Sequence, residues 1–326
     1  MVLALLFIIA SAAVASWCLL RLLIPILRRR FLDQPNARSS HTQPTARGGG
    51  VVFVFVSAAT SVFTLFFNYI SSLPIIVLDI VPLLALPLAF IGFQDDRYSL
   101  PSGWRYGAQL ATAILVILFS PLDLHSILFL PSLVFLLIAV TAIINFTNFM
   151  DGLDGLVAGC MALVLMTSAI KVSAPLPIWA LVGALFGFLF WNWSPAKVFM
   201  GDVGSTFLGA VFAFLVLQSS SWIEALALLL VATPLVSDAC ICVPRRLMAG
   251  QPVFQAHRLH LFQRLHQAGW PHSRVSLTYI GATAVLAIAL LIGGLYWLFA
   301  LSFLELLLGI YLDQRVAVSF ILASKS

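Results

Sequence analysis

Two adjacent carboxylates, Asp95 and Asp96, follow a long apolar run in the segment IGFQDDR. At a membrane surface such a pair is self-repelling unless a cation, an arginine or a proton lies between the two groups. The pair could therefore bind a metal-diphosphate group, or act as a base that keeps a phosphate nucleophile ionised. The alternative is a solvated loop start beside Arg97, because paired aspartates are common at helix ends.

Polar residues recur at three-residue spacing within 145–155, directly after another apolar run. On a helix, Asn145, Asn148 and Asp151 would face roughly one direction, and Asp154 continues the spacing. Burying these groups is unfavourable unless a polar ligand meets them. The alternative is a polar packing stripe between helices, but two aspartates are more than packing requires.

Asp202 lies at a predicted loop-to-helix junction in the segment MGDVGST. The free amides of a helix N-terminus attract phosphate, and Gly204 and Ser205 belong to this turn. Asp202 beside them would hold a divalent cation. We expect Mg²⁺, which prefers oxygen ligands and bridges phosphates, with Mn²⁺ as a substitute. The alternative is an ordinary helix start that Ser205 or Thr206 caps.

Histidine, arginine and glutamine fill the longest polar loop, in the segment HRLHLFQR. Helical spacing would place His257, His260 and Arg264 on one face, with Arg258 and Gln263 in the same segment. These side chains suit hydrogen bonds to sugar hydroxyls, an acetamido group or phosphate. Two alternatives stay open. One is a His-x-x-His zinc site, for which no clear third and fourth ligands are spaced, and the other is a basic helix on anionic lipid.

A basic loop with the sequence RSSHTQPTARGGG precedes the apolar run at 49–70. Arg38, His41 and Arg47 could meet a phosphate there. The more common explanation for such a loop is that basic residues flank a membrane span on its inner side.

Apolar runs dominate the chain that must position these groups. The 326 residues are 62% hydrophobic and only 9% charged, whereas a soluble domain carries about 25% charged residues. A helix needs about 20 apolar residues to cross a bilayer, and it satisfies its own backbone groups in lipid. We therefore predict an all-α, polytopic transmembrane helical bundle that forms one domain over 1–326. The ten or eleven predicted spans are 2–27, 49–70, 73–93, 105–121, 125–147, 156–173, 176–193, 204–221, 222–242, 275–298 and, as an optional eleventh, 299–320.

Polar loops alternate with short plain connections along this series, and nearly all Lys and Arg residues lie in or beside the polar loops. This asymmetry predicts that these loops are cytoplasmic and that the N-terminus is periplasmic. It also accounts for the net charge of +5, so no nucleic-acid partner is expected. Because the basic cluster follows the first apolar run, we expect a retained helix rather than a signal peptide. The five polar loops are about 28–48, 94–105, 146–155, 194–203 and 243–274.

The cysteines carry little functional information. All four lie in or beside apolar runs, and only the weak C-x-C at 240–242 resembles metal-ligand spacing. We interpret them as small core hydrophobes. They are Cys18, Cys160, Cys240 and Cys242.

Together the motifs resemble the polyprenyl-phosphate N-acetylhexosamine-1-phosphate transferase family, glycosyltransferase family 4, which includes phospho-N-acetylmuramoyl-pentapeptide transferase. The resemblance rests on Asp95-Asp96 and on four loops in family order. These are the R-x-x-H-x-x-P-T-x-R-x-G-G loop from Arg38, N-x-x-N-x-x-D-G-x-D-G at 145–155, G-D-x-G-S at 201–205 and the histidine loop at 257–264. The H-R-x-H-x-x-Q-R form is similar to the branch that initiates O-antigen or capsule-type glycans. It differs from the loop of the peptidoglycan enzyme.

This resemblance implies a reaction and site roles. N-acetylhexosamine 1-phosphate, including 6-deoxy forms, would pass from a UDP-sugar to undecaprenyl phosphate in the bacterial inner membrane, with release of UMP. Asp202 would bind Mg²⁺, and Asp95 would deprotonate or orient the lipid phosphate with support from Asp96. Membrane lipid is a further expected partner, and a homodimer is compatible with the sequence. The residues that match the family's nucleotide- and metal-contacting stripe are Asn148, Asp151 and Asp154.

Two functions of other classes remain as alternatives. A secondary transporter would carry polar or charged residues near the middle of the membrane, in broken helices, whereas these charges gather at one predicted face. A structural membrane scaffold has no reason to gather carboxylates, amides and histidines on that face.

Overall fold

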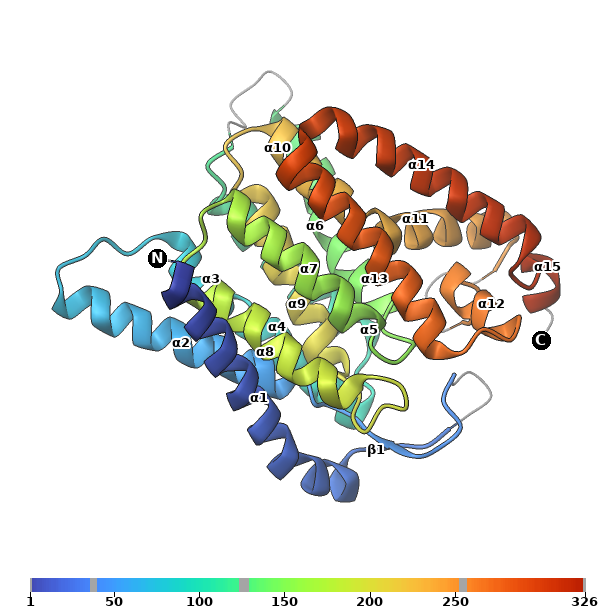
Figure 1. The fold of residues 1–326 in the computed structure, drawn as a ribbon, viewed down its shortest axis with the longest axis horizontal. Helices are drawn as coiled ribbons and strands as arrows, with labels where there is room; N and C mark the ends of the chain where they lie inside the picture. The colour runs from blue at the N-terminus through green and yellow to red at the C-terminus, as the bar shows by residue number, and fades with distance from the viewer. Residues whose placement is uncertain (1, 36–39, 123–128, 252–256, 325–326) are drawn as a thin grey trace.

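The computed structural model describes residues 2–35, 40–122, 129–251 and 257–324, and its regular structure is almost entirely helical (Figure 1). The predicted all-α bundle is thereby confirmed. A single short antiparallel pair among the described residues joins β1 (Leu32–Asp33) to β2 (Thr45–Ala46). The helices are α1 (Val2–Arg30), α2 (Val51–Ile70), α3 (Val77–Leu84), α4 (Leu86–Tyr98), α5 (Ser102–Leu118), α6 (Phe129–Phe149), α7 (Leu156–Lys171), α8 (Leu176–Asn192), α9 (Asp202–Leu217), α10 (Trp222–Val231), α11 (Thr233–Met248), α12 (Leu261–Gln267), α13 (His272–Ile288), α14 (Gly294–Arg315) and α15 (Phe320–Ala323).

Several of these helices are suited to a membrane. Within the described residues, five helical segments are long and apolar enough to cross a bilayer, and a bent pair could make a sixth. α7, α8 and α9 are apolar but shorter. The multi-pass character is therefore supported, while the number of ten or eleven spans stays a prediction.

Two predicted spans are each divided into two helices. The run 73–93 divides into α3 and α4, and the run 222–242 divides into α10 and α11, which meet at 85°. A proline in the first turn of α4 and of α11 explains both breaks, because proline lacks an N–H and is tolerated only where a helix begins. A short π-helix (Ala289–Gly293) follows α13, and α14 then folds back alongside it (Figure 1). α14 (Gly294–Arg315) overlaps the optional eleventh span, which is predicted at 299–320.

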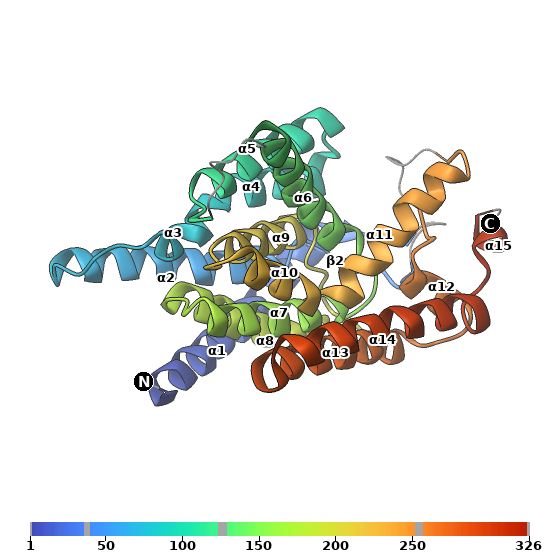
Figure 2. The same cartoon turned by 90° about the horizontal axis from the view of Figure 1, so that it is seen from above.

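α9 lies in the middle of the bundle. Figure 2 shows α4, α5 and α6 on one side of it and α7 and α8 on the other. Every residue from Val203 to Leu217 is buried. A helix that is apolar on all sides belongs in a core, so the N-terminus of α9 is a fixed point around which other elements are arranged.

The basic loop runs beside the segment that leads into α9. Ala46 and Val198 form a parallel bridge, the Gly49 amide donates to the Phe199 carbonyl at 2.9 Å, and the Gly50 amide donates to the Met200 carbonyl at 2.9 Å. These backbone bonds place Arg47 next to the start of α9.

α1 packs closely along α8 through a small-residue motif. Gly183 and Gly187 lie one turn apart in α8, and a Cβ at either position would overlap a backbone carbonyl of α1, that of Ile9 or Ala13. Glycines at i and i+4 allow such close contact between membrane helices. This contact holds the N-terminal helix, and with it the start of the basic loop, against the rest of the bundle.

We expect Gly187→Ala to destabilise the protein by about 1–3 kcal/mol, the usual cost of overpacking a tight contact. Thermal unfolding of the purified protein in detergent measures the effect. Gly281→Ala in α13 is the matched control, because a Cβ there meets no atom within 4 Å and alanine is the better helix former. Equal stability of the two variants would contradict this account of the α1–α8 contact.

Candidate active site at the N-terminus of α9

The structure brings Arg47, Asp96 and Asp202 together although they lie far apart in the sequence. Arg47 Nε lies 2.7 Å from Asp96 Oδ1, and Arg47 Nη2 lies 2.8 Å from Asp202 Oδ1. The Asp96 side chain is fully buried, and its carboxylate accepts hydrogen bonds from the Asp202 amide at 2.9 Å and the Val203 amide at 3.2 Å. Asp96 thus caps α9 from another helix and compensates its dipole.

This cap corrects a prediction. α9 begins at Asp202, and neither Ser205 nor Thr206 caps it. Both lie within the first turn instead, where Thr206 Oγ1 donates to the Asp202 carbonyl at 2.7 Å. Gly201 just before the helix has φ +73°, and a Cβ there would overlap the Asp96 carboxylate. Only glycine fits this turn, which explains the sequence G-D.

Asp95 points to a different set of partners from Asp96. Its carboxylate accepts hydrogen bonds from the Leu100 amide at 2.7 Å and from Arg105 Nη1 at 3.1 Å, and it also lies against the Asp202 carboxylate. Two carboxylates in contact require a proton or a cation between them.

This pair fits a magnesium ion by its donor chemistry. Mg²⁺ is usually held by one or two carboxylates, several waters and substrate phosphates rather than by a full protein cage. Among the described residues no three carboxylates come close enough together to share an ion. Asp95 and Asp202 form a pair of this kind.

Asp151 completes the acidic side of the site. Burial raises the pKa of Asp151 to about 8, and the negative charges of Asp202 and Asp96 add to this effect, while Arg47 opposes it. The same carboxylates hold the pKa of Arg47 above its usual range, although burial lowers it. The guanidinium therefore stays charged and is the main compensation for the carboxylates.

Asp154 contacts other residues than Asp151 does, in the polar loops that precede α9 and α13. It accepts a hydrogen bond from the Ala196 amide at 3.1 Å, and His272 Nδ1 lies 3.2 Å from its carboxylate. Burial opposes ionisation, but these contacts outweigh it and lower the pKa of Asp154. Asp154 Oδ2 receives both contacts, so this carboxylate joins the loops that carry Ala196 and His272.

The predicted polar stripe is helical only in its first half. α6 ends at Phe149, so Asn145 and Asn148 share a helix while Asp151 and Asp154 lie in the turns that follow. The expectation that Asp151 shares their helical face was therefore wrong. Asn148 Nδ2 donates to Ser205 Oγ at 2.8 Å, and this bond joins α6 to the first turn of α9.

A cavity opens beside Asp202 between α4, α5, α6 and the histidine loop. It exposes the predicted residues Asn145, Asn148, His257 and His260 together with Asp202. Sequence reasoning missed four further polar side chains of its lining. These are Arg105, Tyr106, Gln109 and Thr206.

α5 supplies most of the missed residues, and the signal was present in the sequence. Arg105 and Gln109 are one helical turn apart at the start of an apolar helix, a spacing that puts both on one face. Gln109 forms two hydrogen bonds with Asn145, at 2.7 and 3.1 Å. The amide pair fixes the polar face of α5 toward the cavity.

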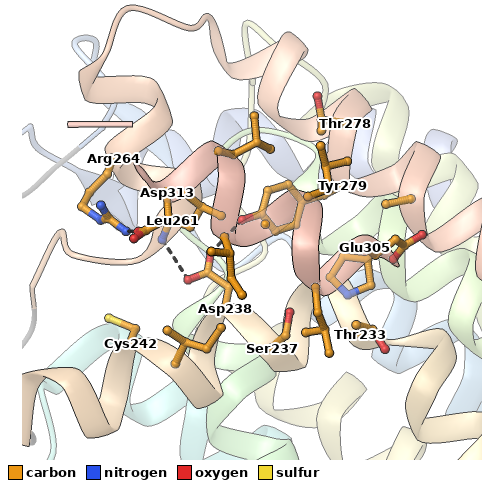
Figure 3. A pocket seen from close by; sticks show the side chains of 18 of the residues that line it. Thr233, Ser237, Asp238, Cys242, Leu261, Arg264, Thr278, Tyr279, Glu305 and Asp313 are labelled. Atoms are coloured by element: carbon orange, nitrogen blue, oxygen red, sulfur yellow. Dashed lines mark hydrogen bonds and ion pairs between the residues drawn. The ribbon is translucent and has the colours of Figure 1, made fainter. Parts of the chain in front are cut away.

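The histidine loop is anchored by Asp238 of α11, a residue that the sequence did not single out. Its carboxylate accepts hydrogen bonds from the Leu261 amide at 2.8 Å, the Phe262 amide at 3.0 Å and the Tyr279 hydroxyl at 2.7 Å. Figure 3 shows Asp238 between Leu261 and Tyr279. α12 therefore starts at Leu261, so the predicted helical face shared by His257 and Arg264 does not form.

The two histidines of this loop have opposite electrostatic surroundings. Burial lowers the pKa of His257 to about 3, and neighbouring His260 adds to the effect, so the His257 ring is neutral. Burial would also lower the pKa of His260, but its contact with Asp238 outweighs burial and raises the pKa to about 9.

Arg264 lies away from the cavity beside Asp202, contrary to the expectation that it meets the substrate. Its side chain is 3% exposed, pairs with Asp313, and donates to the carbonyls of Leu259 at 3.0 Å and Val318 at 2.9 Å. Figure 3 shows Arg264 and Asp313 beside a second, largely apolar cavity. The physical reason is that a buried guanidinium must satisfy its donors within the protein.

The other predicted residues lie around the same loops. Gln263 Oε1 accepts a hydrogen bond from the His260 amide at 3.3 Å, and the Arg258 carbonyl accepts one from Gln267 at 2.9 Å. Gly204 is buried against α2. His41 packs edge-on against Phe199, with ring centroids 4.9 Å apart. Arg38 lies outside the described residues.

The five polar loops meet at one end of the bundle. Besides the Arg47 pairs and the Asp154 contacts, His272 Nε2 lies 3.1 Å from the Ser40 carbonyl. The resulting site combines two adjacent carboxylates, a charged guanidinium and the cavity-lining amides. Such a set can bind and neutralise a phosphorylated ligand with a cation.

Comparisons with known proteins identify the family of this chain. The model of glycosyl transferase family 4 matches residues 78–220. A probable undecaprenyl-phosphate N-acetylglucosaminyl 1-phosphate transferase of Bacillus subtilis is 27% identical, over 83% of this chain and 81% of its own length. A decaprenyl-phosphate N-acetylglucosaminephosphotransferase of Mycobacterium tuberculosis is 30% identical, over 74% of this chain and 70% of its own length.

A third relative widens the comparison. The phospho-N-acetylmuramoyl-pentapeptide-transferase of Deinococcus radiodurans is 30% identical to this chain, over 84% of the chain and 95% of its own length. The chain is a transferase that belongs to glycosyl transferase family 4.

Proposed function

We propose that the protein transfers an N-acetylhexosamine 1-phosphate from a UDP-sugar to undecaprenyl phosphate and releases UMP. The observation that carries this proposal is the convergence of Arg47, Asp95 and Asp202 at the N-terminus of α9, beside a cavity. The names of the relatives, which include N-acetylglucosaminyl and N-acetylmuramoyl-pentapeptide transferases, support the class of donor. The O-antigen-like histidine loop motif favours a start of O-antigen or a similar cell-envelope glycan.

The chemistry requires positioning and charge neutralisation more than covalent help. An oxygen of the lipid phosphate attacks the β-phosphorus of the donor, the bond to the bridging oxygen breaks, and UMP leaves with that oxygen. Asp95 is placed to orient or deprotonate the attacking phosphate, because it lies beside Asp202 while Asp96 is committed to the helix cap. Arg105 holds Asp95 in place.

A magnesium ion, with manganese as a substitute, belongs to this proposal. Asp202 would hold it with help from Asp95, and it would offset the charge of the diphosphate. Arg47 already bridges Asp96 and Asp202, so it keeps these carboxylates together before any ligand arrives. The charges of Arg47, Asp202 and Asp96 also act on the Asp151 carboxyl group.

The cavity lining suits a ligand with both polar and apolar parts. Leu88, Ile91 and Phe149 line it together with the amide and carboxylate groups. The acceptor has a polar phosphate head and a lipid tail that stays in the membrane, so the enzyme must bind it at the membrane surface. We therefore place the site at the cytoplasmic face of the bacterial inner membrane, with the N-terminus in the periplasm, as the distribution of basic residues predicts. A homodimer is compatible with this arrangement.

We expect Asp202→Asn and Asp95→Asn each to lower UMP release by at least about 100-fold, the scale on which a positioned electrostatic group contributes. The assay uses purified protein, undecaprenyl phosphate, Mg²⁺ and a UDP-sugar. Glu224→Gln is the matched control, because Glu224 is an exposed carboxylate at the start of α10 whose partner is Ser220. Full activity in either site variant would remove that residue from the mechanism.

A panel of donors tests the proposed sugar. We expect UMP release from UDP-N-acetylhexosamines, 6-deoxy forms included, and little from the muramoyl-pentapeptide donor. The physical reason is the small set of polar side chains in the cavity lining. Its amides and hydroxyls can bind the acetamido group and hydroxyls of a sugar, but they are too few for a peptide. Preference for the pentapeptide donor would contradict the proposed branch, and no UMP from any donor would contradict the proposed reaction.

A further inference from the structure

Cys242, His257 and His260 form a cluster in the wall of the cavity beside Asp202. Each offers a ligand atom, and the three atoms lie within 4.8 Å of one another. Cys242 comes from α11, whereas both histidines come from the loop before α12. Among the described residues this is the one group of three or more His, Cys, Asp or Glu side chains that is close enough to hold a metal ion.

His260 is oriented as a metal-binding histidine. Its Nδ1 lies 3.3 Å from Asp238 Oδ1, which leaves Nε2 as the ring nitrogen for another partner. A carboxylate on the far nitrogen fixes the ring and raises its basicity in many metal sites. Asp238 and Cys242 lie one turn apart on α11, so the same helix face supplies the carboxylate and the thiol; Figure 3 labels both.

The buried Nε2 atom of His260 points to a missing ligand. His260 is 1% exposed, and its Nε2 has no hydrogen-bond partner among the described residues. An unsatisfied polar atom in a protein interior is unfavourable, and most such atoms find a partner. The side chain lies against the Cys242 thiol, which is itself only 4% exposed.

His257 supplies the third group. Its ring stacks on that of His260, with centroids 4.9 Å apart. Its Nδ1 accepts a hydrogen bond from the Leu259 amide at 3.2 Å, which is at the long end for such a bond. A metal ion at this nitrogen would replace that bond.

We propose that Cys242, His257 and His260 bind one zinc ion. A thiolate and two imidazoles are typical zinc ligands, whereas Mg²⁺ prefers oxygen. Three protein ligands leave one coordination position for water or a ligand oxygen. Both histidines line the cavity beside Asp202, while Cys242 lines the second cavity, so the ion would sit in the wall between them.

This site would fasten the histidine loop to α11. Asp238 already holds the start of α12 through two backbone amides, and a zinc ion would add a second attachment only four residues along the same helix. The inference does not depend on the proposed reaction, because metal binding is measured without donor or acceptor.

The test uses the purified full chain, freed of metal and titrated with Co²⁺ as a spectroscopic substitute for Zn²⁺. We expect one Co²⁺ per chain with a thiolate-to-metal charge-transfer absorption, and displacement by Zn²⁺ but not by excess Mg²⁺. Cys242→Ser should weaken binding by at least about 10-fold and abolish that absorption. Cys240→Ser is the matched control, two residues away and exposed.

A second variant guards against a folding defect in Cys242→Ser. A chain in which Cys18, Cys160 and Cys240 are changed to serine keeps Cys242 as its only thiol, and it should retain the charge-transfer absorption. Absence of Co²⁺ and Zn²⁺ binding to the wild-type protein would overturn the proposal and leave the cluster as a buried His260–Asp238 ion pair. Equal binding to Cys242→Ser and wild type would also overturn it.

Discussion

The compensation of buried negative charge around the N-terminus of α9 is the constraint on which the site depends. Asp96 is fully buried, and Asp202 and Asp95 lie beside it in a chain that is largely apolar. Arg47 and the first amides of α9 supply the opposite charge and partial charge. Without them the carboxylates would have to take up protons or separate.

This constraint explains why distant loops must meet. Arg47 belongs to the loop after α1, Asp95 and Asp96 belong to α4, and α9 supplies Asp202 and the amides. Backbone hydrogen bonds between the basic loop and residues 199–200 fix the first of these. The fully buried path of α9 fixes the last, so a rigid apolar core holds a polar site at its end, where catalytic geometry benefits most from a stiff support.

Much of this arrangement could be predicted from the sequence, and each failure has a physical cause. Apolar runs and the four motifs predicted the all-α bundle and the residues that gather, because burial of Asp and Asn in such a chain demands a partner. The breaks near Ala85 and Ala232 were missed although Pro87 and Pro234 stand beside them in the sequence. The start of α12 and the role of Arg264 could not be predicted, since each depends on a tertiary contact. Asp238 was missed because a single carboxylate in an apolar run gives no pattern.

The two ends of the histidine loop contact different parts of the protein, the cavity beside Asp202 and the C-terminal segment. His257 and His260 reach the cavity beside Asp202, whereas Arg264, one turn into α12, reaches the C-terminal segment through Asp313 and Val318. Asp238 sets this division, because it fixes where α12 begins and hence which side chains precede the helix. A shift of α11 would therefore move the wall of the cavity and the C-terminal anchor together. The bend of 85° between α10 and α11 sets the direction of α11 and so places Asp238 at the start of α12. This bend is therefore as necessary for the geometry of the site as the motifs that line the cavity.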